Sequence, residues 1–328
     1  MDVNFSKISK ILVIRLSSLG DVILTTPLLR EIKSLYPHIS LHFLVNENYK
    51  DVVINNPNLD KIYLYNKDKQ IEFNTGFDLV IDLQNNRRSR NIVKTLTSPV
   101  VSFTKPQLDK FLLVNFKINR FKNIIPIPVR YASSIPGIEV KAPPEIFTGN
   151  INCELLNEVD KKITIGLAPG SRHFTKMWPE KYFLELSSKL VETGYKVVIF
   201  GGNSDIEIGA RIAEKIDGVI NLTNNNELLK TVECMKNCSA VVCNDSGMMH
   251  TATAARVPVV AIFGSTVKEF GFAPFSPESI VLENTGLSCR PCSHIGKEEC
   301  PKKHFRCMIE ITPEMVFNKL IKLLEPHD

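Results

Sequence analysis

The first regular segment of the chain limits its possible folds most strongly. An apolar, β-rich run over residues 11–16 leads into a small polar loop, Ser17-Ser18-Leu19-Gly20, and Asp21 then opens a helical pattern. A strand, a glycine-containing turn and a helix form the opening unit of a doubly wound α/β domain. Ligands bind such domains beyond the carboxyl ends of the strands. The sequence therefore predicts that Asp21 lies where a ligand would bind.

Two roles are open for Asp21 at this point. Asp is among the residue types preferred as a helix N-cap, which would make its role structural. A carboxylate in the same place can also act as a general base on a substrate hydroxyl. The loop is not a dinucleotide fingerprint, because it lacks the G-x-G-x-x-G pattern.

The chain has 328 residues, which is enough for two domains. Strand and helix patterns alternate through the first half, fade between about residues 130 and 160, and restart at Lys162. Several prolines interrupt the fading stretch, and proline disfavours the interiors of helices and sheets. We expect one α/β domain over residues 1–155, a second over 156–311, and a C-terminal helical segment over 312–328.

The composition is that of an ordinary soluble protein, with 44% hydrophobic and 23% charged residues. The N-terminal residues contain no apolar core of a signal peptide. No apolar run approaches the roughly 20 residues that span a bilayer. We therefore expect a cytoplasmic protein.

Positive charge is concentrated in one part of the chain, although the net charge is only +5. Between Leu83 and Arg130 the only acid is Asp109, whereas the basic residues are Arg87, Arg88, Arg90, Lys94, Lys105, Lys110, Lys117, Arg120, Lys122 and Arg130. Such a field would attract a phosphorylated lipid, a nucleic acid or an anionic membrane. The alternative is a solvated basic face with no partner.

The second half contains a predicted anion site. Pro169-Gly170-Ser171 and Asp245-Ser246-Gly247 each follow a strand pattern and precede a helix. Small residues let backbone N–H groups approach a phosphate, and a helix N-terminus attracts negative charge. Lys176 adds a full positive charge. Because no paired carboxylates suited to magnesium accompany these loops, we expect a diphosphate to be held without a metal.

Two acids follow the Gly201-Gly202 turn in this half. In α/β nucleotide sites an acid near such a turn often binds ribose hydroxyls. We prefer Asp205 to Glu207, because it lies closer to the strand end. The alternative is that Asp205 only stabilises the N-terminus of its own helix.

The eight cysteines fall into two groups. Four are scattered and are expected to be buried packing residues: Cys153, Cys234, Cys238 and Cys243. The other four cluster within residues 286–308: Cys289, Cys292, Cys300 and Cys307. In a cytosolic protein this spacing favours structural zinc, with free thiols, disulfides and an iron–sulfur cluster as alternatives. His294 and His304 are alternative ligands nearby.

Four blocks of the sequence, in chain order, resemble the bacterial ADP-heptose:lipopolysaccharide heptosyltransferases of glycosyltransferase family 9. The blocks are residues 14–22 with Thr26-Pro27, residues 169–171 with 176–179, residues 244–247 with His250, and residues 258–264. They extend over roughly residues 10–266, and residues 82–90 resemble the family pattern less sharply.

The resemblance implies a GT-B fold, with two Rossmann-like domains facing each other across a cleft. In that family the first domain takes the acceptor, the second takes the nucleotide sugar, and the last helix crosses back onto the first domain. The chemistry inverts the anomeric centre without a bound metal or other cofactor. The resemblance assigns the catalytic base to Asp21.

The same resemblance implies two sets of binding residues. On the donor side they are Ser171, Lys176, Asp205, Asp245, Ser246, Gly247 and His250. On the acceptor side, together with the basic stretch, we expect Ser18, Gly20, Arg87, Arg88, Arg90, Lys117 and Arg120.

The implied partners are ADP-heptose and a lipopolysaccharide core acceptor on Kdo- or heptose-bearing lipid A, with no nucleic acid. The implied location is the cytoplasmic face of the inner membrane, with peripheral attachment to its anionic surface. Alternatives are a transferase for another nucleotide sugar, a GT-B nucleotide-sugar epimerase, and a non-catalytic sugar- or polyanion-binding protein.

Overall fold

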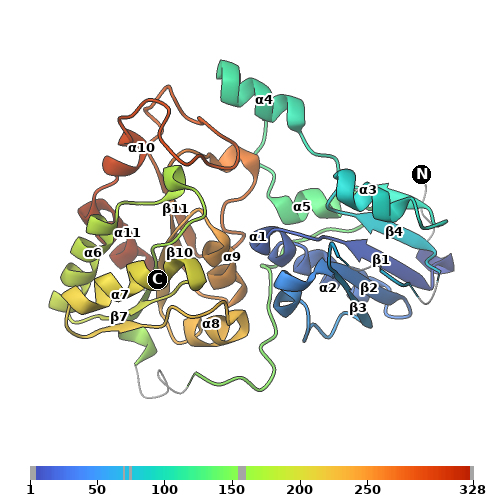
Figure 1. The fold of residues 1–328 in the computed structure, drawn as a ribbon, viewed down its shortest axis with the longest axis horizontal. Helices are drawn as coiled ribbons and strands as arrows, with labels where there is room; N and C mark the ends of the chain where they lie inside the picture. The colour runs from blue at the N-terminus through green and yellow to red at the C-terminus, as the bar shows by residue number, and fades with distance from the viewer. Residues whose placement is uncertain (1–4, 69–70, 74–75, 154–159, 326–328) are drawn as a thin grey trace. The chain divides into compact units, whose positions relative to one another are not determined.

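The computed structural model describes residues 5–68, 71–73, 76–153 and 160–325. The chain divides into two units (Figure 1). The first unit comprises Met1–Lys105 and Ile125–Gly149, and the second comprises Pro106–Ile124 and Asn150–Asp328. The boundary that the sequence suggested, between residues 155 and 156, lies outside the described residues.

The first unit is built on a five-stranded parallel sheet in the order β3-β2-β1-β4-β5. Its strands are β1 (Lys10–Ile14), β2 (Ser40–Asn46), β3 (Lys61–Tyr65), β4 (Leu79–Asp82) and β5 (Val100–Ser102). Its helices are α1 (Leu19–Ile23), α2 (Thr26–Leu35), α3 (Arg87–Val93) and α5 (Ile127–Ala132), with short 3-10 turns η1 (Phe5–Lys7) and η2 (Glu47–Val52).

Strand β1 occupies the centre of this sheet, which explains its apolar sequence. Its residues pair with β2 from Lys10 opposite Ser40, and with β4 from Ile11 opposite Leu79. A central parallel strand covered on both faces loses water from every side chain, so it reads as a continuous apolar run. The loop that leads to Asp21 therefore begins at the carboxyl end of the central strand of the unit.

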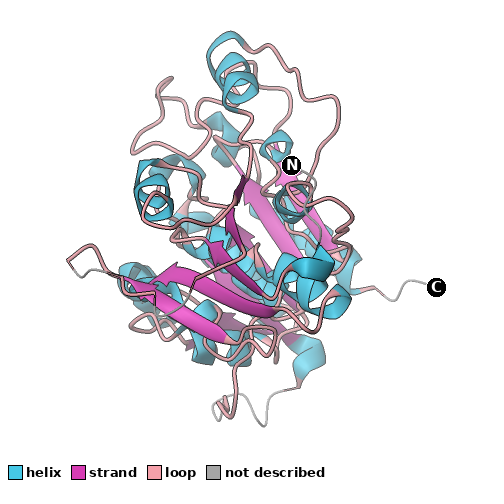
Figure 2. Ribbon diagram, turned by 90° about the vertical axis from the view of Figure 1, so that its right-hand side faces the viewer, coloured by secondary structure: helices cyan, strands magenta, loops and turns pink. Residues whose placement is uncertain are grey.

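The second unit is built on a six-stranded parallel sheet in the order β11-β10-β9-β6-β7-β8, with helices beside the strands (Figure 2). Its strands are β6 (Thr164–Ala168), β7 (Lys196–Ile199), β8 (Val219–Asn221), β9 (Ala240–Asn244), β10 (Val259–Phe263) and β11 (Ser279–Glu283). Its helices are α4 (Gln107–Phe116), α6 (Glu180–Glu192), α7 (Ile206–Lys215), α8 (Leu228–Met235), α9 (Gly247–Ala254), α10 (Arg306–Ile309) and α11 (Pro313–Leu324). Short 3-10 turns are η4 (Lys161–Ile163), η5 (Phe174–Lys176), η6 (Asn203–Asp205) and η7 (Lys268–Phe270).

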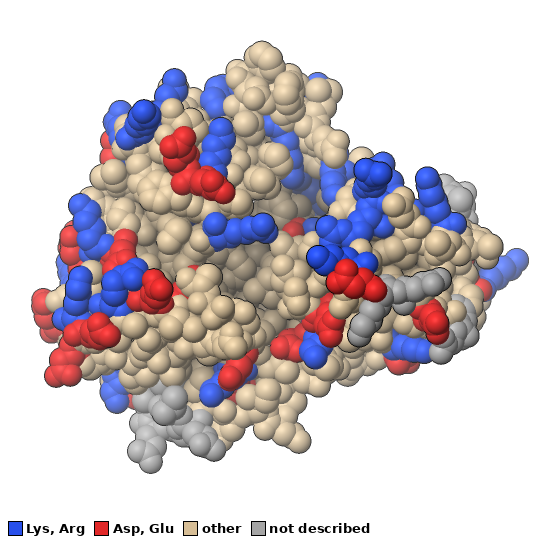
Figure 3. Space-filling model, viewed as in Figure 1, with Lys and Arg blue, Asp and Glu red and all other residues tan. Residues whose placement is uncertain are grey.

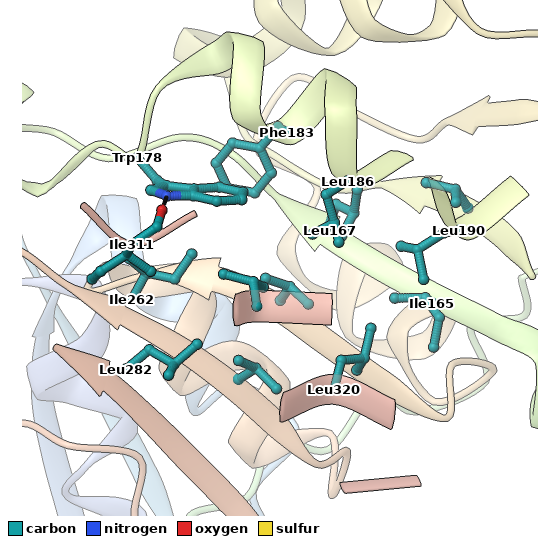
Figure 4. Close-up of a cluster of buried hydrophobic side chains, with 14 of the residues drawn as sticks. Ile165, Leu167, Trp178, Phe183, Leu186, Leu190, Ile262, Leu282, Ile311 and Leu320 are labelled. Carbon is teal, nitrogen blue, oxygen red and sulfur yellow. Dashed lines mark hydrogen bonds between the residues drawn. The ribbon is translucent and has the colours of Figure 1, made fainter. Parts of the chain in front are cut away.

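A buried apolar cluster joins the sheet of the second unit to α6 and α11 (Figure 4). The single tryptophan, Trp178, is 1% exposed, and its indole N–H donates to the backbone oxygen of Ile311 at 2.7 Å. That bond fixes the chain two residues before α11 begins. Val316 and Leu320 of α11 are fully buried in the same cluster.

The last helix packs within the second unit, and the expectation that it also crosses back onto the first domain stays a prediction. Helix α11 lies against α6, β9, β10 and β11 of its own unit. The physical reason is the match between its apolar stripe and the cluster around Trp178, which removes that stripe from water.

The segment Pro106–Ile124 belongs with the second unit, although it interrupts the first in sequence. The ammonium of Lys117 donates to the backbone oxygen of Pro291 at 2.6 Å, and the ring of Phe121 meets that of Phe270 at 6.3 Å. The pattern of the sequence had not indicated helix α4 here. Across the described residues, no helix combines the length and the apolar character needed to cross a bilayer.

The scattered cysteines are buried as expected, but two of them are also bonded to each other. Cys153 and Cys234 form a disulfide, whereas Cys238 and Cys243 are buried thiols. The sequence had not predicted this pair, because the two residues are 81 positions apart.

Candidate active site

Asp21 is held by an arginine from the strand that precedes it. A guanidinium nitrogen of Arg15 lies 2.6 Å from one carboxylate oxygen of Asp21. The other oxygen accepts bonds from the hydroxyl of Ser18 at 2.8 Å and its backbone N–H at 3.2 Å. Ser18 is the N-cap of α1, so Asp21 occupies the third helical position and reaches back to the cap, as in a capping box. The prediction that Asp21 is itself the N-cap is therefore wrong, because the N-cap is Ser18, three residues earlier.

The charge of this carboxylate is determined by two opposing effects. Burial by itself would raise the pKa of Asp21, but the Arg15 charge and the Ser18 hydrogen bonds outweigh it and lower the pKa. Burial also opposes the charge of Arg15, yet the Asp21 carboxylate raises the arginine pKa. Asp21 is therefore ionised at neutral pH, with both oxygens already oriented by hydrogen bonds.

Further polar groups fix this arrangement from other parts of the first unit. Arg15 also donates to the backbone oxygen of Leu83 at 2.6 Å, and its guanidinium lies 5.7 Å from the ring centre of Tyr131. Tyr131 is 1% exposed and hydrogen-bonds the Asp21 carboxylate. Burial and the nearby negative charge of Asp21 both raise the pKa of Tyr131. The side-chain oxygen of Gln84 accepts from the backbone N–H groups of Leu16 and Ser17.

A second polar turn follows β4. Asp82 is 1% exposed and accepts from the N–H groups of Gln84 at 3.0 Å and Asn85 at 2.8 Å, and from the Ser89 hydroxyl at 2.8 Å. Lys105 donates to the backbone oxygens of Gln84 and Asn85, and burial lowers its pKa. These bonds satisfy Asp82 internally, so its role is to shape the turn that leads into α3.

The predicted acceptor arginines emerge from this turn. Arg87, Arg88 and Arg90 are all exposed residues of α3. Arg90 donates to the side-chain oxygen of Asn85 at 3.0 Å, and the Arg88 guanidinium lies 5.8 Å from the Tyr65 ring centre. Basic side chains gather over α3 in the space-filling view (Figure 3). Ser18 is the N-cap of α1 in the same unit, and Gly20 is the residue of α1 that precedes Asp21.

The other two predicted acceptor residues do not belong to this group. Lys117 and Arg120 lie in the segment that belongs with the second unit. The ammonium of Lys117 donates to two backbone oxygens, of Val114 at 2.7 Å and of Pro291 at 2.6 Å. In the structure Lys117 thus anchors α4, and its contact with an acceptor stays a prediction.

In the second unit the predicted donor residues follow the carboxyl ends of β6, β7 and β9. The ammonium of Lys176 lies 2.8 Å from a carboxylate oxygen of Asp245, and the two side chains are 15% and 8% exposed. The same oxygen accepts from the Thr266 hydroxyl at 2.5 Å. Three loops that are far apart in sequence therefore meet at one carboxylate.

Asn244 holds two of these loops together. It is fully buried, and its amide donates to the backbone oxygen of Pro169 at 2.7 Å. Its side-chain oxygen accepts from the backbone N–H of Trp178 at 2.9 Å. Ser171 continues the first loop and is partly exposed. Ser246 and Gly247 open α9, and His250 lies buried one turn along it.

Two glycines make room for Asp205. A Cβ atom at Gly170 would lie 2.1 Å from a carboxylate oxygen of Asp205, and one at Gly201 would lie 2.5 Å from its Cβ. These contacts place the Asp205 carboxylate directly against the Gly170 loop. One oxygen accepts from the Gly202 N–H at 3.0 Å. Glu207, in contrast, has a side chain that is 92% exposed, so the geometry favours Asp205 of the two candidates.

The cysteine-rich segment is attached to this cluster of loops. The buried side chain of Arg290 donates to the backbone oxygens of Gly264 at 2.6 Å and Thr266 at 2.8 Å. The Thr175 hydroxyl, next to Lys176, accepts from the backbone N–H of Lys297 at 2.8 Å. The segment thus holds the loops of Lys176 and Thr266 in place through these hydrogen bonds.

The zinc prediction finds no support in this geometry. Across the described part of the chain, no group of three or more His, Cys, Asp or Glu side chains is arranged to hold a metal ion. The sulfur of Cys289 lies 3.7 Å from a ring nitrogen of His304, and all four cysteines of the segment are free thiols. Burial raises the pKa of Cys307 to about 11, which keeps that thiol protonated at neutral pH.

Comparison with known proteins agrees with this architecture. Two parallel α/β sheets, each with polar loops at the carboxyl ends of its strands, place the chain in the GT-B class of folds. The model of glycosyltransferase family 9 (heptosyltransferase) matches residues 70–304, and the chain belongs to that family.

Solved structures share the fold along nearly the whole chain. The family 9 glycosyltransferase from Veillonella parvula aligns with a TM-score of 0.76 at 24% identity, over 99% of this chain and 98% of that one. The Escherichia coli ADP-heptose lipopolysaccharide heptosyltransferase II aligns with a TM-score of 0.72 at 21% identity, and the alignment covers 96% of this chain and 98% of that one.

Among characterised sequences, lipooligosaccharide heptosyltransferase 2 of Haemophilus influenzae is 31% identical over 166 residues. That alignment covers 49% of this chain and 47% of the relative. The chain thus spans about half the length of the curated relatives that it matches at this level of identity.

The sequence reasoning missed several residues that shape the two sites. Arg15 was visible as a lone arginine at the end of an apolar strand, six residues before the acid it binds. Tyr131 and Thr266 gave no such signal, because each reaches its site only through the fold.

Proposed function

We propose that this protein is an inverting, metal-independent glycosyltransferase that moves heptose from ADP-heptose to the inner core of lipopolysaccharide. Membership of the heptosyltransferase family supports the reaction class. The observation that carries the mechanism is the ionised Asp21 carboxylate, oriented by Arg15 and Ser18 at the end of β1.

In the proposed reaction, Asp21 takes the proton of an acceptor hydroxyl while the oxygen attacks the anomeric carbon. The bond from that carbon to the diphosphate breaks, and ADP leaves with the electron pair. A lowered pKa makes Asp21 a weak base. A weak base is sufficient when the bond to the diphosphate breaks ahead of the attack. The acceptor hydroxyl then becomes acidic only as its oxygen bonds to the oxocarbenium-like carbon.

Residues of the second unit would stabilise the departing diphosphate. Lys176 supplies the positive charge, and the small residues at Ser171 and Gly247 let backbone N–H groups approach the phosphates. The buried hydroxyl of Ser246 makes no hydrogen bond to the described residues, and it is available to a ligand. Asp205, packed against Gly170, would bind the ribose.

The acceptor side of the proposal rests on α3. Its exposed Arg87, Arg88 and Arg90 suit a core oligosaccharide that carries carboxylates and phosphates. The proposed acceptor is the Kdo- or heptose-bearing core on lipid A, reached from the cytoplasm with peripheral attachment to the inner membrane. Lys117 and Arg120, in the segment that belongs with the second unit, stay candidate contacts.

The epimerase alternative is less well supported. The family model that matches is that of heptosyltransferases, and Asp21 is the acid that the geometry prepares for proton transfer in the first unit. A transferase for a different nucleotide sugar uses the same residues, so the donor must be determined directly.

The test is a transfer assay with purified protein and a panel of nucleotide sugars. Core acceptors that end in Kdo, in one heptose or in two heptoses would each be offered, and ADP release and product mass would be measured. We expect mass gain equal to one heptose with ADP-heptose and one class of acceptor. Transfer of another sugar, or interconversion of the donor without an acceptor, would overturn the proposal.

Zinc in the cysteine-rich segment stays a separate prediction that the mechanism does not use. Elemental analysis for zinc and iron, with an acid-labile sulfide assay, distinguishes a zinc site from an iron–sulfur cluster and from free thiols. A protein free of both metals would leave the four cysteines as thiols, as the structure has them.

A further inference from the structure

Helix α4 and the residues after it expose an unusual set of large apolar side chains. Leu108, Phe111, Phe116 and Ile118 are 61%, 54%, 61% and 52% exposed. On the opposite side of the helix, Leu113 is only 6% exposed. Single exposed apolar residues are common on protein surfaces, but several within eleven positions form a patch that calls for a partner. We name these four residues the α4 patch.

The patch faces outward because the other side of the segment is anchored. The ammonium of Lys110 lies 5.7 Å from the ring centre of Phe270 and 5.5 Å from that of Phe272. Lys117 donates to the backbone oxygen of Pro291 at 2.6 Å. Within the patch, the rings of Phe111 and Phe116 contact each other at 5.8 Å. The surface over the outer part of α4 is largely uncharged in Figure 3.

The cysteine-rich segment extends the same surface. Ile295 is 56% exposed, and its neighbour His294 lies close enough to Lys110 for that charge, in addition to burial, to lower the histidine pKa. The cysteine-rich segment therefore holds α4 in place through Pro291 and adds the apolar side chain of Ile295 to the exposed surface. This gives the cysteine-rich segment a supporting role that requires no catalysis.

The charge around the patch identifies its partner. Residues 106–124 carry four basic side chains, Lys110, Lys117, Arg120 and Lys122, against the single acid Asp109. Exposed aromatic and aliphatic side chains with a basic surround are the pattern of helices that lie in the interface of an anionic bilayer. Each basic group near such a surface adds attraction, and an acidic surround would have opposed it.

We propose that the α4 patch inserts into the headgroup region of an anionic membrane and holds the second unit on it. The inference rests on the proposed function, which includes peripheral attachment to the inner membrane, and it names the surface that makes this attachment. That surface is separate from Asp21 and Lys176. Burial of the two phenylalanine rings in the interface would supply much of the attachment, and the basic residues would make it depend on lipid charge.

The first test is sedimentation with vesicles that contain no lipopolysaccharide. One set would be phosphatidylethanolamine with phosphatidylglycerol, and the other pure phosphatidylcholine. We expect binding to the anionic vesicles only, and at least a tenfold loss of partition for the double variant Phe111→Ser, Phe116→Ser. The matched control is Leu35→Ser, because Leu35 is an apolar residue of the first unit that is 52% exposed. Equal binding by wild type and the double variant would overturn the proposal.

A fluorescent reporter gives an independent measurement that does not depend on weakening the fold. The only native tryptophan is buried, so Phe111→Trp adds one exposed indole to a constant background. We expect a blue shift of the added emission with anionic vesicles, and none for Leu35→Trp. The absence of a shift for Phe111→Trp would contradict insertion.

Two further results separate this proposal from the proposed function. The double variant should keep wild-type turnover on a delipidated core acceptor, while its turnover on vesicle-borne acceptor falls. Vesicle binding through the α4 patch by a protein that transfers no heptose would leave the inference intact and remove the function. Concentration-dependent dimerisation abolished by the double variant, without vesicle binding, would assign the patch to a second copy of the chain and overturn the inference.

Discussion

Each unit holds a buried ion pair at the carboxyl end of its sheet, and the two pairs differ in how firmly they are fixed. In the first unit Arg15 binds Asp21 at 2.6 Å and also donates to a backbone oxygen, while Ser18 binds the other carboxylate oxygen. In the second unit Lys176 meets Asp245 at 2.8 Å. The planar guanidinium of Arg15 is held through two nitrogens, one on Asp21 and one on the Leu83 backbone oxygen, whereas a lysine ammonium is a point charge on a flexible stem.

The difference suggests a division of labour. The Arg15–Asp21 pair keeps a carboxylate charged and oriented, which suits a group that must stay in place during proton transfer. The Lys176–Asp245 pair can open at little geometric cost, and Asp245 retains the Thr266 hydroxyl when it does. Lys176 is therefore suited to exchange its carboxylate partner for the phosphates of a donor.

Removal of the charge of Asp21 should have the largest effect. We expect Asp21→Asn to lower kcat by about 10³-fold, in the range seen when a general base is lost, while ADP affinity stays within about twofold. Steady-state rates and calorimetric titration with ADP measure the two effects. The variant also leaves Arg15 buried without its charge partner, so a lower Tm is expected. Asp217→Asn, at an exposed site, is the control, and near-wild-type turnover by Asp21→Asn would refute the assignment.

The lysine of the second pair should come next. Lys176→Ala should reduce kcat/KM by about 10²-fold, because a charge that stabilises the leaving diphosphate is lost. Unlike Asp21→Asn, this variant should also weaken ADP binding. Lys215→Ala, on an exposed part of α7, should change neither quantity. If Lys176→Ala binds ADP normally and turns over within threefold of wild type, the donor site lies elsewhere.

Removal of the partner of Asp21 tests the fixed pair through its pH dependence. Because the pKa of Asp21 is lowered in the folded protein, its carboxylate stays ionised until the pH falls to that lowered value. The stability that the ionised form adds is fully present above the ordinary Asp pKa, and it is lost as the pH falls through the folded pKa. In Arg15→Met, burial acts without the opposing charge and raises that pKa, so the acidic limb of kcat/KM should move to higher pH. Arg30→Met removes another partly buried, paired arginine and should leave the profile in place. An unchanged limb in Arg15→Met would show that Arg15 is not the residue that keeps Asp21 ionised.

The smallest effect is expected at the proposed ribose contact. Asp205→Ala should weaken ADP binding about tenfold, the size of one hydrogen bond to a charged group. Glu207→Ala should leave ADP binding within twofold, because the side chain of Glu207 points into solvent. Calorimetry of both variants provides the comparison. A larger loss at Glu207 than at Asp205 would reverse the assignment drawn from the Gly170 contact.

The sequence determined the local parts of this protein. The apolar run from residue 11 predicted β1, and the pattern after the glycine-containing turn predicted helix, which the structure divides into α1 and α2. The restart at Lys162 located the second sheet in the same way. Arg15 and Asp21 belong to one strand–loop–helix unit, so their meeting follows from a short stretch of chain.

Tertiary structure alone decided the rest. Lys176, Asp245 and Thr266 come from three separate loops, and only the order of β6, β9 and β10 in the sheet brings their side chains together. The same holds for α11, which follows the apolar cluster around Trp178, and for the 106–124 segment, which leaves the first unit in favour of the second. A sequence pattern records which faces must be buried, but not which of several apolar surfaces will bury them, because that depends on shape and contacts between residues far apart in the chain.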